Sequence, residues 1–177
     1  MAEMRILGVR LIETTPNYDH RGVLSTIYQE SEAGVFQQWN HISSHANVLR
    51  GVHAHLDYDE LYVPVQGRMF LFLKDARPWS PSFAKEMSFW SDDIQDKSLF
   101  VPRGVAHGVY FATFGNLIYG LSRSWTGDGE LICRWDAPEI RTRWPNAHPI
   151  LSNKDSVAGG FVEMTRTIEE AEKSIGA

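Results

Sequence analysis

The sequence has almost no cysteine and no long apolar run. Cys133 is the single cysteine among 177 residues, which rules out a disulfide within the chain and favours a reducing compartment. No apolar stretch approaches the length that crosses a bilayer, and the segment MAEMRILGVRLIE carries acidic residues where a secretory signal would be apolar. We therefore expect a cytoplasmic protein without a membrane segment.

An excess of positive charge is also missing. The chain has 17 Lys and Arg residues against 22 Asp and Glu residues, a formal net charge of −5, which argues against binding to nucleic acid or to an anionic membrane. An anionic small ligand would have to be held by a few individually placed Arg and Lys side chains. Repeats, linkers and low-complexity segments are missing as well, so we expect a single domain over residues 1–177.

Short segments of alternating hydrophobicity make up most of the chain. Leu61, Val63 and Val65 recur at every second position and share one face of a predicted strand. The segments 98–112 and 116–125 follow the same pattern and are rich in aromatic and β-branched residues. Clusters of Pro, Gly, Asp and Asn punctuate these segments, as turns between strands require.

A helix is indicated only near the end of the chain. Thr167 is followed three residues later by Glu170 in the segment TIEEAEKSIGA, which is the spacing of a capping box and predicts a helix start. Many short strands with so little helix predict an all-β sandwich or small barrel. Inward-facing side chains at the mouth of such a barrel form a natural ligand site.

Two histidines one residue apart are the most informative feature of the segment LRGVHAHLDYDELYVPVQG. On a strand, His53 and His55 project to the same side and Ala54 projects to the other. Glu60 lies near the start of the next predicted strand, and His107 follows a Pro-Gly turn. A lone histidine is more often a hydrogen-bonded structural residue, but two on one face favour a functional site.

The spacing of these residues resembles the metal-binding motifs of cupins. The pattern is His-x-His-x4-Glu-x6-Gly followed by Pro-x-Gly-x2-His, and an Asn that usually follows the last histidine is missing. Three imidazoles and a carboxylate suit Zn, Fe, Ni or Mn. The residues that match are His53, His55, Glu60, Gly67, Pro102, Gly104 and His107.

Nearly the whole chain resembles the dTDP-4-dehydrorhamnose 3,5-epimerases, a cupin-fold family that does not use the metal. This resemblance implies a double-stranded β-helix (a jelly-roll barrel) with a short C-terminal helix, no cofactor, and a homodimer that forms by strand exchange at the barrel edge. The matching segments occur in order: DHRG (19–22), NHISSHANVLRGVH (40–53), KDARPWSPSF (74–83), FVPRGVAHG (100–108), LIY (117–119) and WDAPEIRTRWP…PILSNKD (135–155).

The family inverts carbons next to the ketone of a nucleotide-linked 4-keto-6-deoxy sugar, which requires a base, a stabilised enolate and an acid on the opposite face. The resemblance implies that His53 is the base, that Asp155 orients it and that Tyr119 is the acid. Arg residues at the site would pair with the diphosphate. The resemblance also implies that Trp125 stacks on the nucleobase of the substrate. The implied substrate-binding residues are Arg21, Asn40, Arg50, His55, Glu60, His107, Glu130 and Lys154.

Two positions depart from the family. Glu60 lies where the family has a lysine thought to stabilise the oxyanion, and His55 replaces a glutamine. A carboxylate beside an enolate is repulsive unless it is protonated or holds a cation. An epimerase could instead use protonated His55 and His107 for this purpose, and we favour this interpretation over a sugar-nucleotide-binding cupin without activity.

Two further interpretations stay open. The segment RGVHAH also resembles the cupin-fold 3,4-ketoisomerases, which act on the same class of 4-keto nucleotide sugar. A metal-dependent cupin would use His53, His55, Glu60 and His107 as ligands. The metal interpretation conflicts with the epimerase, because His53 cannot bind an ion, donate to Asp155 and still accept a proton.

Overall fold

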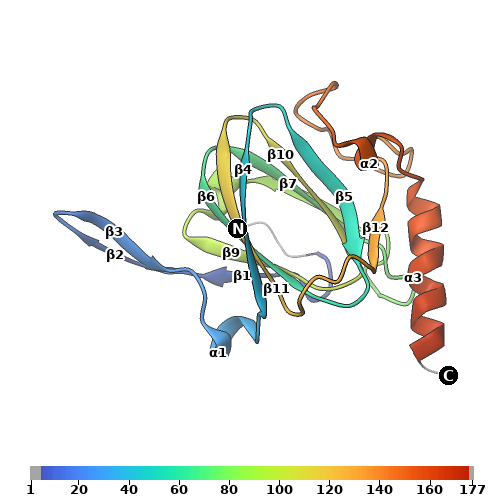
Figure 1. The fold of residues 1–177 in the computed structure, drawn as a ribbon, viewed down its shortest axis with the longest axis horizontal. Coiled ribbons are helices and arrows are strands. Elements are labelled where there is room, and N and C mark those ends of the chain that lie inside the picture. Colours follow the sequence, from blue (N-terminus) through green and yellow to red (C-terminus); the bar gives the residue numbers. More distant parts are fainter. Residues whose placement is uncertain (1–4, 176–177) are drawn as a thin grey trace.

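The protein folds into two antiparallel five-stranded sheets that face each other and close into a barrel (Figure 1). The computed structural model describes residues 5–175. Residues 1–4 and 176–177 lie outside the described residues. Both ranges belong to the predicted domain, and residues 176–177 also belong to the predicted helical segment. The prediction of an all-β barrel with a C-terminal helix is confirmed.

From β4 onward, the chain passes back and forth between the two sheets, except that the consecutive strands β7 and β8 both lie in the second sheet. The first sheet has the order Arg10–Glu13 (β1), Lys97–Val101 (β9), Glu60–Gln66 (β6), Gly115–Leu121 (β11) and Gln38–Ser44 (β4). The second has the order Glu130–Ile132 (β12), Leu49–His55 (β5), Val105–Phe111 (β10), Met69–Asp75 (β7) and Glu86–Trp90 (β8). A separate hairpin contains Thr15–Asp19 (β2) and Gly22–Thr26 (β3).

Helical segments are few and mostly short. None of the helices within residues 5–175 is long and apolar enough to span a membrane. The segments are Glu30–Ala33 (α1), the 3₁₀ turn Ser91–Ile94 (η1), Asn153–Ser156 (α2) and Phe161–Ile175 (α3).

Apolar side chains from both sheets meet inside the barrel. Tyr62, Leu99 and Leu117 from the first sheet belong to one buried cluster with Leu71 and Val109 from the second. Burying a large apolar side chain contributes roughly 1.5–3 kcal/mol, so this cluster holds the sheets together. Val109 and Leu117 also line the cavity described below, and the core therefore supports the wall of that cavity.

Helix α3 covers the outer face of the second sheet, beside β5 and β12 (Figure 1). Phe161, Met164 and Ile168 form an apolar stripe on the helix and belong to one buried cluster with Ala54 and Phe72. Because Ala54 faces this helix, the residues before and after it on β5 face the barrel interior, as the sequence predicts.

The helix begins at Phe161, so the prediction that Thr167 starts it is wrong. Thr167 lies in the second turn, and its hydroxyl donates to the carbonyl of Glu163. A Thr and a Glu three residues apart also occur inside an amphipathic helix, where neither caps anything. The buried stripe that starts at Phe161 fixes the helix on the sheet instead.

Strand β6 turns its polar side chains toward the interior. Leu61 is fully buried, but it packs against Phe36 in a cluster separate from the barrel core. Val65, on the same face, is 57% exposed near the end of the strand. Glu60 and Tyr62 alternate with these residues and line the interior cavity. The face of β6 that matters for function is therefore the polar one.

The β2–β3 hairpin extends away from the barrel (Figure 1). Its side chains include the exposed apolar residues Tyr18, Val23 and Leu24. Apolar side chains gathered on a protruding element are typical of a surface that binds another protein.

Candidate active site

A cavity of about 360 Å³ lies between the two sheets. Strands β5 and β10 contribute to one wall, and β4, β6 and β11 contribute to the other. Asp155 contacts His53 from just outside this lining. The predicted site residues that the structure brings together around the cavity are Asn40, Arg50, His53, His55, Glu60, His107, Tyr119, Trp125, Glu130 and Lys154.

His53 is paired with a carboxylate that is distant in the sequence. Both His53 and His55 project from β5 into the cavity, as their spacing predicts. The Nε2–H of His53 donates to Oδ1 of Asp155 at 2.7 Å. Nδ1 is then the ring nitrogen that can accept a proton. A carboxylate in this position fixes the tautomer and stabilises the imidazolium that forms on proton uptake.

A one-turn helix, α2, holds Asp155 in place. The Ser152 hydroxyl caps this helix: it accepts from the backbone N–H of Asp155 at 3.1 Å and donates to Oδ2 of Asp155 at 2.8 Å. Burial acts to raise the pKa of Asp155, but the hydrogen bonds from His53 and Ser152 outweigh it and keep that pKa below its ordinary value. Asp155 is therefore an ionised, oriented carboxylate.

The free nitrogen of His53 faces a second acid. Its Nδ1 lies 3.7 Å from Oε1 of Glu130, and Nζ of Lys154 donates to Oε2 of Glu130 at 3.0 Å. Burial acts to raise the pKa of Glu130, but the hydrogen bond from Lys154 and the nearby His53 lower it overall. A carboxylate at this distance stabilises the imidazolium form of His53 after the ring has taken up a proton.

Tyr119 faces these groups from the opposite sheet. It lies on β11 and lines the same cavity as His53. Burial, followed by the charges of Glu60 and Glu130, raises the pKa of Tyr119, so the phenol keeps its proton at neutral pH. Its ring lies beside that of Tyr62, its partner on β6, with centroids 5.9 Å apart. The cavity thus has a proton acceptor on one wall and a proton donor on the other.

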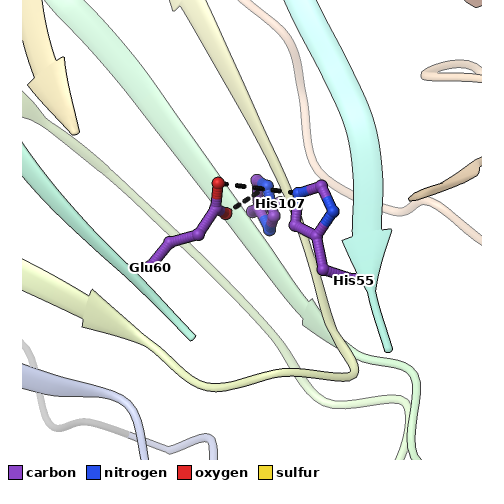
Figure 2. Close-up of side chains that lie close together, drawn as sticks. All are labelled: His55, Glu60 and His107. Atoms are coloured by element: carbon purple, nitrogen blue, oxygen red, sulfur yellow. Dashed lines mark ion pairs between the residues drawn. The ribbon is translucent and has the colours of Figure 1, made fainter. Parts of the chain in front are cut away.

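A second group of polar side chains is buried and lines the cavity, and Figure 2 shows how the three members point toward one another. We call His55, Glu60 and His107 the buried His–Glu cluster, because one ligand atom of each lies within 4.8 Å of the others. Oε2 of Glu60 is 2.9 Å from Nε2 of His107, and Oε1 is 3.5 Å from Nε2 of His55. The hydroxyl of Tyr62 donates to Oε2 of Glu60 at 3.0 Å.

The predicted Pro-Gly turn places His107. The N–H of Val105 donates to the carbonyl of Pro102 at 3.1 Å, and Gly104 has a φ of +76°, which a type II turn requires at its third position. The N–H of Gly104 donates to the carbonyl of His55 at 2.8 Å and ties the turn to β5. Nδ1 of His107 then donates to the carbonyl of Val105 at 3.0 Å.

The cluster carries charge despite its burial. Burial acts to raise the pKa of Glu60, but the two histidines and the hydrogen bonds lower it to about 2. Burial lowers the pKa of His55 to about 4, so His55 is neutral at neutral pH and does not supply the positive charge expected of it from the sequence. Burial also acts to lower the pKa of His107, but Glu60 outweighs it and raises that pKa. Glu60 is therefore an ionised carboxylate that requires a positive neighbour.

Two sequence assignments do not fit the chain's own cavity. Arg21 lies on the protruding hairpin, where it pairs with Asp19 and its side chain is 79% exposed. The reason is that the hairpin points away from the barrel. His53 lies outside the metal-ligand group, because its nitrogens face the carboxylates of Asp155 and Glu130. The predicted four-residue metal set is therefore not assembled, although its other three members are.

Sequence reasoning missed three polar residues that line the cavity: Gln38, Tyr58 and Tyr62. Gln38 and Tyr62 lie two positions from predicted residues on β4 and β6, so the two-residue period of a strand was a signal that could have found them. Tyr58 lies in the loop before β6, and its ring stacks on His55 with centroids 4.4 Å apart. No periodic pattern marks a loop residue of this kind.

The fold and the site together define a cupin-type barrel with paired acid–base groups in its cavity. The family model described as dTDP-4-dehydrorhamnose 3,5-epimerase matches residues 3–163. This chain belongs to that family, whose members are enzymes of the epimerase class.

Individual relatives match along most of their length. The dTDP-4-dehydrorhamnose 3,5-epimerase of Mycobacterium tuberculosis (strain H37Rv) is 31% identical over 178 residues, which cover 92% of this chain and 87% of the relative. That of Sinorhizobium fredii is 27% identical over 173 residues, covering 91% and 89%. The solved structure of the M. tuberculosis epimerase has a TM-score of 0.84 at 27% identity, covering 98% of this chain and 96% of that one. These matches confirm the predicted jelly-roll fold of the cupin type.

Proposed function

We propose that the protein epimerises a nucleotide-linked 4-keto-6-deoxyhexose, inverting C3 or both C3 and C5. The observation that carries this proposal is the 2.7 Å contact between His53 and Asp155, with Tyr119 opposite them on the other sheet. Family membership supports the class of substrate. We place the reaction in the cytoplasm, where the free, buried thiol of Cys133 stays reduced.

The reaction begins with proton transfer to His53. Nδ1 takes the proton from a carbon next to the ketone, and the electron pair of the broken C–H bond moves toward the ketone oxygen to form an enolate. Asp155 stabilises the imidazolium, and Glu130 adds to this effect. Tyr119 then returns a proton to the opposite face of the same carbon, which inverts it. Proton exchange with solvent restores His53 and Tyr119.

The edge of the cavity suits a nucleoside diphosphate. Arg50 is exposed and lines the cavity, and its Nε donates to Oγ of Ser44 at 2.9 Å, which fixes the guanidinium near the opening. A fixed guanidinium pairs well with phosphate oxygens. Lys154 adds a second cation, and the half-exposed ring of Trp125 offers a stacking surface for a nucleobase.

We also propose that two copies of the chain form a homodimer through the β2–β3 hairpin. The hairpin carries exposed apolar side chains away from the barrel and holds Arg21, which the family resemblance assigns to the substrate site. Docking on a second barrel would bury these side chains and bring Arg21 toward the cavity of the second copy.

The test is incubation with a dTDP-4-keto-6-deoxyhexose in heavy water, followed by proton NMR of the sugar. Deuterium at C3 and C5 supports a 3,5-epimerase, and deuterium at C3 alone supports a 3-epimerase. A product with its carbonyl at C3 would identify a 3,4-ketoisomerase instead. Absence of exchange with several nucleotide carriers would overturn the proposal.

A further inference from the structure

We propose that the buried His–Glu cluster binds a divalent first-row transition-metal ion through Nε2 of His55, the carboxylate of Glu60 and Nε2 of His107, without His53. This inference rests on the proposed function and supplies the cation that holds the enolate oxygen. It differs from the cofactor-free site that the family resemblance implies, and it uses three of the four residues of the metal motif.

The spacing of the donor atoms suits one ion. Two ligand atoms that each lie about 2.1 Å from a metal are separated by roughly 3.0–3.5 Å at the angles of octahedral or tetrahedral coordination. Nε2 of His107 is 2.9 Å from Oε2 of Glu60, and Nε2 of His55 is 3.5 Å from Oε1 of Glu60. One ligand atom of each of the three side chains lies within 4.8 Å of the other two. Two imidazoles and one carboxylate form a ligand set that Mn, Fe, Co, Ni and Zn ions share.

Hydrogen bonds outside the cluster already orient two of the three ligands. Nδ1–H of His107 donates to the carbonyl of Val105 at 3.0 Å, which directs the Nε2 lone pair at Glu60. The hydroxyl of Tyr62 donates to Oε2 of Glu60 at 3.0 Å and fixes the carboxylate. Metal-binding histidines and carboxylates are typically oriented by partners of this kind.

A positive species must lie between Nε2 of His107 and Glu60, since a lone pair and a carboxylate repel each other. A proton on Nε2 would satisfy this pair but would do little for His55. Nε2 of His55 is 3.5 Å from Glu60, too far for a strong hydrogen bond. The buried Nδ1 of His55 has no hydrogen-bond partner among residues 5–175. One ion shared by all three side chains accounts for the convergence of His55 as well.

The three-residue set removes the conflict between metal binding and proton abstraction. His53 keeps its hydrogen bond to Asp155, and its Nδ1 stays available for the substrate. All three cluster residues line the same cavity as His53, so open coordination positions on the ion can accept the ketone oxygen. When His53 takes the α-proton, the negative charge that develops on this oxygen lies beside the ion.

The experiment uses the full chain, purified without an affinity tag and stripped with a chelator. We expect Co²⁺ to bind with one ion per chain and to give a visible d–d absorption. Glu60→Gln and His107→Gln should each weaken Co²⁺ binding by at least about 100-fold. His148→Gln changes an exposed histidine outside the cluster and should bind Co²⁺ as the wild type does. Failure of Co²⁺ to bind, or equal binding by Glu60→Gln, would overturn the inference.

A second measurement needs no variant and so does not depend on how a variant folds. Bound Co²⁺ should shift the NMR signals of the His55 and His107 rings strongly as direct ligands, and the Nε2–H signal of His53 to Asp155 should remain. If Co²⁺ abolishes the Nε2–H signal because His53 itself binds the ion, the three-residue ligand set is wrong.

Deuterium exchange separates this inference from the proposed function. We expect the stripped protein to exchange at least about tenfold more slowly than the Co²⁺-loaded protein. Full exchange by the stripped protein would refute the metal site and leave the epimerase standing. Co²⁺ binding without exchange in either form would refute the epimerase and leave the metal site standing.

Discussion

The two polar groups in the cavity wall differ in their access to solvent. The proton-transfer group, which we define as His53, Asp155, Glu130 and Lys154, is partly open: the side chains of His53 and Glu130 are each 22% exposed. The side chains of the buried His–Glu cluster are at most 7% exposed. Both groups contain histidine and carboxylate, so composition alone does not separate their roles.

This difference in access matches the difference in task that we propose for the two groups. A residue that takes a proton in every turnover must return it to solvent, and His53 is open enough to do so. A charge that only stabilises an enolate is more effective where water is excluded, because the low local dielectric strengthens its effect. The buried cluster meets that second requirement.

Replacement of His53 should have the largest effect on activity. His53→Ala removes the proton acceptor, and we expect the rate of deuterium uptake to fall by about 10³-fold, within the range typical of a general base. Proton NMR of the sugar in heavy water measures this rate. His41→Ala, an exposed histidine on β4 outside the cavity lining, is the matched control and should exchange normally. A loss below about tenfold in His53→Ala would refute its role.

Replacement of Tyr119 should separate exchange from inversion. In Tyr119→Phe, His53 can still remove and return a proton on its own face, so deuterium uptake should continue. Inversion should slow by about 10²-fold, because the donor on the opposite wall is gone. The ratio of exchanged to inverted product reports this difference. Unchanged stereochemical outcome would show that another group delivers the proton.

The pH dependence of stability should report the charge of Asp155. Its folded pKa lies below the ordinary 3.8, so its ionised form stabilises the fold above that pH, and this contribution is lost as the pH falls through the folded value. Between about pH 5 and pH 2, the wild type should therefore lose more unfolding free energy than Asp155→Asn. Urea unfolding at each pH tests this. If the unfolding free energies of the wild type and of Asp155→Asn change in parallel with pH, the hydrogen bonds from His53 and Ser152 do not stabilise the ionised form of Asp155.

The smallest effect on stability is expected at the open edge of the proton-transfer group. Lys154 is 67% exposed and pairs with Glu130, so Lys154→Met should change the unfolding free energy by less than about 1 kcal/mol. The KM for the nucleotide sugar should rise, because the variant lacks a cation near the position that we propose for the diphosphate. A large drop in stability with an unchanged KM would assign Lys154 to the fold instead.

The sequence predicts the parts of the site that follow local rules. The two-residue period of a strand places His53 and His55 together, and the Pro-Gly turn predicts the position of His107. The barrel follows from the many short alternating segments. The same rules do not show which face of β6 points into the barrel, because both faces carry buried side chains. Leu61 is buried outside the barrel core, in the cluster with Phe36.

Contacts between residues that are distant in the sequence are not predicted by any local sequence pattern. Asp155 meets His53 across 102 residues, and it is carried by a helix of a single turn that has no periodicity. Only the family resemblance pointed to this pair. The start of α3 was misplaced for a related reason: the buried stripe from Phe161 packs against a sheet that is distant in the sequence.

The central claim concerns which nitrogen of His53 is free to act as a base, and ¹⁵N NMR of the imidazole rings tests it most directly. We predict that neutral His53 carries its proton on Nε2, which is hydrogen-bonded to Asp155, and that its Nδ1 is unprotonated. The His53→Gln variant is used to assign the signals. A proton on Nδ1, or a metal ion on either nitrogen of His53, would contradict the account.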